Sequence, residues 1–354
     1  MNFSRVMVLA SSLACAFVFG LAPAPACCPA PPHGRAVVNA NQTVILLWDA
    51  ANKTQHFIRK ASFASEADDF GFLVPTPQEP ELAESGEDAF DYLAKLTKPR
   101  FETRYRFTSM GCIEATRTAT VGDAVNVLQQ KIVAGFKATV LEAKSAQALV
   151  GWLKENGYAF SPEVEAWAKP YVEAGWKMTA LKLTKGPDPS AGKNVAAKSL
   201  RISFKTDRPL FPYREPDPTS FAKELNARHR TLRIYFIGEA RYKGALGDGA
   251  AWSGNTVWSK PLAPGERENL LHLLDLPATT GPATWRLTEI EDNWLYRSAP
   301  ADVYFAPDAD QSETERPPTP QFVNVPSELV LLGGIALVAA TIFAVRSVAR
   351  RNSK

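Results

Sequence analysis

The chain has 354 residues and a formal net charge of +3. Removing Arg5 and the four cations of the last nine residues leaves a charge of −2, so the middle of the chain lacks the basic balance that a nucleic-acid binder needs. Only four Cys and four His are present, which restricts thiol, metal and imidazole chemistry to a few positions.

The N-terminus has the pattern of a secretory signal. Arg5 precedes an apolar run over 6–21, and Ala24 and Ala26 form a small-residue cleavage site. We therefore predict a signal peptide at 1–26 and a mature chain that begins at Cys27. Two alternatives are a lipoprotein signal, which would also place a Cys first but normally has Leu where Ala24 stands, and an uncleaved signal that becomes a second span. Each places the middle of the chain outside the cytoplasm.

The exported part, 27–305, reads as a run of short strands with a few helices. Alternation and β-branched content predict strands at 43–48, 54–65, 70–74, 100–107, 137–141, 176–183, 200–206, 231–239, 284–290 and 302–305. Helices are predicted at 88–95, at 145–156, from 162 onward, at 218–227 and at 266–276. Because helices do not alternate with single strands, the fold class is α+β with mainly antiparallel strands. A break between two subdomains could fall near Val121.

Individual residues set some of these boundaries. Ser145 is a suitable N-cap, and Gly157 is suited to the end of the same helix. Pro75 and Pro77 should end the strand before them or place it at a sheet edge, since proline has no ladder donor. Pro170 should kink or end the helix that begins at Pro162. The Gly-rich stretch 244–254 is interpreted as a flexible loop, since no Lys-Ser/Thr follows it as in a phosphate-binding loop.

The C-terminus is predicted to hold the protein at a membrane. Residues 306–325 are acidic and Pro-rich, typical of an extended stalk. The uncharged run 329–345 lies within a predicted transmembrane helix at 326–346. The basic tail 347–354 follows, and the positive-inside rule places it in the cytoplasm. We expect a single-pass membrane protein with a periplasmic or extracellular ectodomain. A buried core helix is one alternative. Another is a cleaved sorting signal, because the segment resembles bacterial tails of the Pro-Glu-Pro type.

Three cysteines remain once the signal is removed. In an oxidising compartment one bridge is expected, from Cys28 or Cys27 to Cys112. Such a bridge closes a loop of about 84 residues and would stabilise the fold by roughly 4 kcal/mol in the chain-entropy model. Alternatively, Cys27, Cys28 and His33 could bind a soft metal, because thiolate and imidazole suit copper or zinc. The adjacent pair Cys27 and Cys28 could also act in redox chemistry.

No catalytic motif is present. The sequence has no nucleophile elbow, no His-Glu-x-x-His and no Walker loop. His56 falls in a strand pattern and His272 in an amphipathic helix, so both are interpreted as surface or packing residues. Trp152, Trp167 and Trp176 could form a sugar-stacking platform, but their helix and strand positions favour core packing.

Four ordered blocks resemble a known bacterial family. They are 68–77 (DDFGFLVPTP), 90–99 (FDYLAKLTKP), 152–158 (WLKENGY) and 209–216 (PLFPYREP). Together they resemble the exported family catalogued as domain of unknown function 2330. That family has no assigned activity, so the resemblance implies an exported, anchored protein and supplies no catalytic residues.

The sequence as a whole predicts a membrane-anchored cell-surface or periplasmic module with a structural or binding role. We expect no cofactor and no nucleic acid, and an envelope protein or a glycan as a possible partner. The alternatives are an exported hydrolase, which would need a His or carboxylate pair converging in a cleft, and a thiol or metal protein that uses the N-terminal cysteines.

Overall fold

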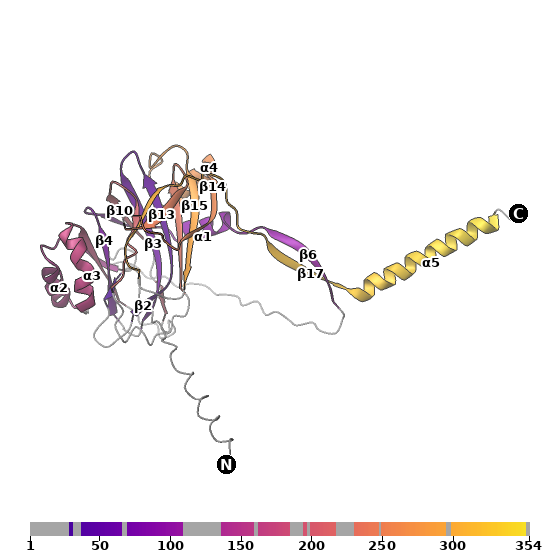
Figure 1. Cartoon of the computed structure of the whole chain (residues 1–354), viewed down its shortest axis with the longest axis horizontal. Coiled ribbons are helices and arrows are strands. Elements are labelled where there is room, and N and C mark those ends of the chain that lie inside the picture. Colours follow the sequence, from indigo (N-terminus) through magenta and orange to yellow (C-terminus); the bar gives the residue numbers. More distant parts are fainter. Residues whose placement is uncertain are drawn as a thin grey trace, which may run out of the picture. The chain divides into compact units, whose positions relative to one another are not determined.

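The computed structural model (Figure 1) describes residues 28–30, 37–65, 69–108, 136–158, 162–184, 194–196, 199–216, 230–247, 249–294 and 299–351. The chain forms two compact units. The first contains 1–96 and 130–314, and the second contains 97–129 and 315–354. Each unit is described by itself below.

A large sheet forms the centre of the first unit. Its strand order is β14-β15-β12-β2-β3-β10-β5, and β9 also pairs with β3. The strands are β14 (Asn255–Pro261), β15 (Arg286–Trp294), β12 (Arg230–Gly238), β2 (Val37–Asp49), β3 (Thr54–Ser65), β10 (Leu200–Lys205), β5 (Glu81–Glu84) and β9 (Asn194–Ala196). All neighbours run antiparallel except β2 and β12, which are parallel.

Strand alternation gives this sheet two apolar faces. Val44 and Leu46 of β2 enter one core cluster, whereas Ile45 and Leu47 enter another. The side chains of β12 alternate between the same two clusters, with Ile234 in the first and Tyr235 in the second. Because successive side chains point to opposite faces, the continuous apolar runs of these strands require a covering layer on each side.

Two smaller sheets cover the first face. One has the order β1-β4-β8-β7 and the other β11-β16-β13. Their strands are β1 (Cys28–Ala30), β4 (Asp69–Thr76), β8 (Lys177–Thr184), β7 (Phe136–Leu141), β11 (Leu210–Phe211), β16 (Val303–Pro307) and β13 (Tyr242–Leu246). Phe72 of β4, Phe211 of β11 and Phe305 of β16 join the same cluster as Val44 and Leu46.

Helices cover the remaining faces (Figure 1). α1 (Asp88–Leu96) and α4 (Pro264–Leu273) pack Phe90 and Leu270 on the second face of the large sheet. α2 (Ala146–Glu155) and α3 (Pro162–Glu173) pack on the outer face of the four-stranded sheet. Trp167 is buried there and donates its indole N–H to the carbonyl of Arg214 at 2.9 Å, which confirms a packing role for this side chain.

The second unit contains a two-stranded ribbon and a helix. β6 (Phe101–Thr108) pairs in parallel with β17 (Thr319–Pro326), and α5 (Ser327–Arg351) follows β17 directly. Among the residues that the structure describes, no helix combines the length and apolar character needed to cross a membrane. The crossing predicted at 326–346 therefore has no support here and stays a prediction.

The α+β class, made mostly of strands, is confirmed. The backbone N–H of Ala148 bonds to Ser145 Oγ at 3.1 Å, so the predicted helix cap is correct, and Gly157 has the left-handed φ of +71° that suits its position after the C-cap. β4 continues past Pro75 and ends at Thr76, directly before Pro77, so the second of the two prolines marks the end of the strand. Pro170 lies inside α3 and does not end it.

One further prediction is contradicted by the structure, and several others are not tested by it. Residues 244–254 do not form a simple loop, since Gly244 to Leu246 belong to β13. The predicted helix at 218–227 lies outside the described residues. The predicted domain boundaries stay predictions, including the break near Val121 and the stalk at 306–325. Asp310, which belongs to the predicted stalk, forms an ion pair with Arg241 at 2.9 Å. The end of the predicted stalk, from Thr319 onward, belongs to β17.

Candidate functional site

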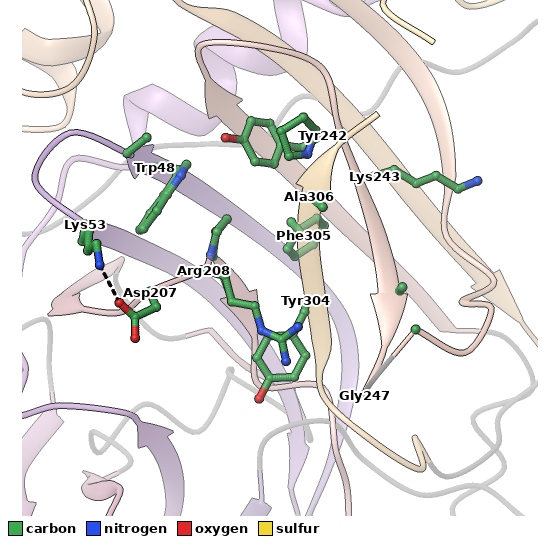
Figure 2. A pocket seen from close by; sticks show the side chains of 15 residues that line it. Trp48, Lys53, Asp207, Arg208, Tyr242, Lys243, Gly247, Tyr304, Phe305 and Ala306 are labelled. Carbon is green, nitrogen blue, oxygen red and sulfur yellow. Dashed lines mark hydrogen bonds and ion pairs between the residues drawn. The ribbon is translucent and has the colours of Figure 1, made fainter. Parts of the chain in front are cut away.

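A cavity of about 530 Å³ opens in the first unit between the large sheet and the three-stranded sheet (Figure 2). Its walls come from the turn between β2 and β3, from the 207–209 connection, and from β13 and β16. The volume lies within the range of about 300–1,000 Å³ that is typical of small-molecule sites. Strand pairing positions these elements, because β13 pairs with β16 along its whole length.

Buried aromatic residues form the floor of the cavity. Trp48, Tyr242 and Phe305 are each less than 5% exposed. Trp48 is the last in the row of alternating side chains that includes Val44 and Leu46, so it points toward the small sheets. Phe236 stacks on Tyr242, with ring centroids 4.5 Å apart. The floor is therefore rigid and apolar.

The one hydroxyl in this floor is already bonded. Tyr242 donates to Glu239 Oε1 and also has a side-chain hydrogen bond with Trp48. Burial, followed by the hydrogen bond to Glu239, raises the pKa of Tyr242 far above its ordinary value. The phenol therefore stays protonated at physiological pH and does not act as a base.

The rim of the cavity is charged. The guanidinium carbon of Arg208 lies 3.9 Å from the ring centroid of Tyr304, a cation–π contact that also fixes the direction of the arginine. Lys53 Nζ pairs with Asp207 Oδ1 at 2.8 Å, and this hydrogen bond lowers the pKa of Asp207 and raises that of Lys53 (Figure 2). Lys243 also belongs to the lining, but its side chain points away from the floor (Figure 2).

This arrangement is suited to binding. The described lining residues include no Ser, Cys or His, and their one carboxylate, Asp207, is exposed and paired with Lys53. Nucleophilic catalysis needs a nucleophile, a base and an orienting group that converge. An apolar floor with Arg208 at its edge instead suits a ligand that has an apolar body and an anionic group.

A serine–histidine pair occurs elsewhere in the first unit. His56 of β3 and Ser203 of β10 are direct cross-strand partners, and Nδ1 lies 2.8 Å from Oγ. Burial, followed by the charge of Arg201, lowers the pKa of His56 to about 4. A histidine with so low a pKa is a weak base, and neither residue lines the cavity described above.

Most of the predicted site residues lie outside the described part of the chain. Cys27, His33 and Cys112 are among them, so the predicted disulfide and the predicted metal site stay predictions. Cys28 begins β1, where its backbone is paired with that of Leu73. Within the described residues, no group of three or more His, Cys, Asp or Glu side chains could hold a metal ion.

Sequence reasoning did not single out the cavity residues. Trp48 and Tyr304 were recognised only as members of strands, and Arg208 directly precedes the block at 209–216. A signal was available in Trp48, a large aromatic residue at the end of a buried strand and next to a turn. The pairing of Arg208 with Tyr304 joins distant parts of the chain and has no local signature.

Comparisons with known proteins give a family and little else. A family model described as "Uncharacterized protein conserved in bacteria (DUF2330)" matches residues 22–291. No curated protein matches the chain. Among solved structures, the chain resembles the crystal structure of baculovirus P35 with a TM-score of 0.34 and 6% sequence identity. That likeness covers 80% of this chain and 97% of the other, and it is too weak to carry an argument.

Proposed function

Since the chain belongs to the bacterial family catalogued as domain of unknown function 2330, which is uncharacterised, we propose a function from its own residues. The protein is an exported binding module tethered to a membrane. The single observation that carries the binding role is the cavity, where a buried aromatic floor meets the oriented guanidinium of Arg208.

The ligand class follows from the chemistry of the cavity. Trp48, Tyr242 and Phe305 are nearly fully buried, so the accessible apolar surface of the cavity comes mainly from the half-buried Tyr304 and from the exposed Ala306 and Pro307. The hydroxyl of Tyr242 is already hydrogen-bonded. The ligand therefore gains by burying an apolar or ring-shaped body, not by making many hydrogen bonds to the floor. Arg208 supplies a charge-assisted contact to a carboxylate, sulfonate or phosphate at the rim. An anionic envelope glycan or an anionic envelope metabolite has this chemistry.

Export and tethering rest on the two ends of the chain. Residues 1–26 have the pattern of a secretory signal, and 329–345 is an uncharged run followed by a basic tail. The structure describes the side chains of α5 from 333 to 346. It therefore describes all of the uncharged run except its first four residues, 329–332. Within the described part, Ile335, Leu337 and Phe343 are all more than 60% exposed, as a helix surrounded by lipid would be.

Isothermal titration calorimetry with 2-naphthoate tests the cavity, since this probe has a ring body and one carboxylate. The full chain in detergent should bind 2-naphthoate more tightly than the neutral analogue 2-naphthylmethanol. Arg208→Gln should weaken 2-naphthoate binding about tenfold or more, because a charge-assisted contact contributes about 1.5–3 kcal/mol. Lys243→Gln is the matched control and should change the affinity little, since Lys243 points away from the floor. Equal binding of the two probes, or no effect of Arg208→Gln, would refute the proposal.

A further inference from the structure

The exposed large apolar side chains that the structure records all belong to the second unit. Four lie in the ribbon of β6 and β17, and six lie in α5. In a soluble domain such side chains are normally scattered singly, and contiguous apolar patches mark interaction sites. The second unit therefore carries an exposed apolar surface of the kind that binds a partner or a membrane.

The ribbon has two chemically different faces. Tyr105 is paired with Val323, and Phe101 lies four residues before Tyr105, so these three side chains share one face. They are 70%, 41% and 59% exposed, respectively. Glu102 and Arg104 lie on the opposite face, where the guanidinium of Arg104 donates to Glu102 Oε2 at 3.0 Å. Phe322 is paired with Arg104 and is 55% exposed, so the ribbon is amphipathic with one large apolar side chain on its charged face.

Its strand pairing is incomplete. β6 and β17 form a sheet of only two strands among the described residues, and the two strands are parallel. Parallel strands are usually covered on both faces, and two-stranded sheets are marginal by themselves. A two-stranded sheet cannot enter the hydrocarbon core of a bilayer, because its edges would lack hydrogen-bond partners there. The headgroup region offers such partners together with an apolar boundary.

Charge and chain continuity both favour an anionic lipid surface as the occupant. Residues 97–108 and 315–326 contain five cations and two carboxylates, a net charge of +3. β17 ends at Pro326 and α5 begins at Ser327, so the ribbon adjoins the segment proposed as the tether. Tyrosine and arginine are also suited to the interface between lipid and water.

We propose that the ribbon of β6 and β17 lies on the membrane surface, with Phe101, Tyr105 and Val323 in contact with lipid and the face of Arg104 toward water. The position of the ribbon next to the membrane rests on the proposed tether. Anionic headgroups neutralise the excess positive charge of the ribbon and of the segments that lead to it.

Hydrogen exchange on the full chain in lipid vesicles tests the inference. In vesicles with anionic phosphatidylglycerol, amides of 101–108 and 319–326 should exchange at least tenfold more slowly than in uncharged detergent. Vesicles of phosphatidylcholine alone should give much less protection. The triple variant Phe101→Ser, Tyr105→Ser and Val323→Ser should lose the protection. The matched control Phe322→Ser, on the opposite face, should keep it.

Three results would overturn the inference. They are equal exchange in vesicles and detergent, protection that survives the triple variant, and protection that rises with the protein-to-lipid ratio, which would indicate a second copy as the occupant. Alkaline carbonate extraction of the same vesicles tests the tether separately. A chain that carbonate releases but whose ribbon is protected in vesicles refutes the tether and supports the ribbon. A chain that stays in the vesicles after carbonate treatment but has an unprotected ribbon supports the tether and refutes the position of the ribbon on the membrane surface.

Discussion

The depressed pKa of His56 makes a specific prediction about acid stability. Burial is the largest cause of the low value, and the charges of Arg201 and Lys205 lower it further, while Asp49 acts in the opposite direction. In the unfolded chain the pKa of His56 returns to about 6.5. The unfolded state therefore binds more protons between about pH 4 and pH 6.5, and the folded state loses stability as the pH falls through that window.

The perturbation is His56→Asn, which replaces the imidazole with a polar amide that does not titrate. With a pKa of about 4 in the folded state, the titration of His56 should lower the free energy of unfolding by about 2 kcal/mol when the pH falls from 7.5 to 4.5. Asp302 titrates in the same range with the opposite sign, since burial raises its pKa to about 6 and it favours the folded state as the pH falls. Asp302 is present in both proteins, so the difference between them isolates His56.

Urea unfolding followed by tryptophan fluorescence, on the full chain and on the variant, measures this difference. The free energy of unfolding of the wild type should fall by about 2 kcal/mol more than that of His56→Asn when the pH is lowered from 7.5 to 4.5. Parallel pH curves for the two proteins would refute the reasoning, because they would mean that His56 has the same pKa in both states.

Two further predictions concern packing in the first unit. Gln55 is fully buried and forms hydrogen bonds with both the N–H and the C=O of Leu210, at 2.8 and 2.7 Å. Gln55→Leu should leave these two backbone groups without partners and lower the free energy of urea unfolding by about 3 kcal/mol. An unchanged urea midpoint would contradict this role of Gln55. A Cβ at Gly244 would lie 2.5 Å from the Trp252 ring, so Gly244→Ala should lower the melting temperature by the equivalent of about 1–3 kcal/mol. The matched Gly151→Ala, in α2 with no atom near the new Cβ, should raise it slightly, and equal effects at the two glycines would contradict the steric argument.

Local signals predicted most individual elements but not their arrangement. β-branched content located β2, and β3 follows it as the second strand of a hairpin. Ser145 located the start of α2, because a cap acts within four residues. β6 was located because aromatic and charged residues alternate along it, a pattern typical of a half-buried strand, yet Phe101 and Tyr105 are largely exposed. Its partner, β17, is more than 200 residues away and reads as a Pro-rich stalk, so periodicity gave no sign of the ribbon.

The candidate site was less predictable than the fold. The cavity joins a turn after Trp48, a connection at Arg208 and a strand at Tyr304, and only the packing of two sheets brings them together. No motif links residues at such separations. The predicted chemistry was placed instead at Cys27, Cys28 and His33, because cysteine and histidine carry recognisable chemistry even in isolation.

The central claim is that the first unit is exported and held at a membrane by the C-terminal segment. The most direct test is proteinase K digestion of intact spheroplasts from a bacterium that produces the full chain, followed by mass analysis of what remains with the membrane. The account predicts that the protease removes the first unit and that a membrane fragment containing 329–345 survives. A first unit that stays intact until the spheroplasts are lysed would contradict export, and a chain found wholly in the soluble fraction would contradict the tether.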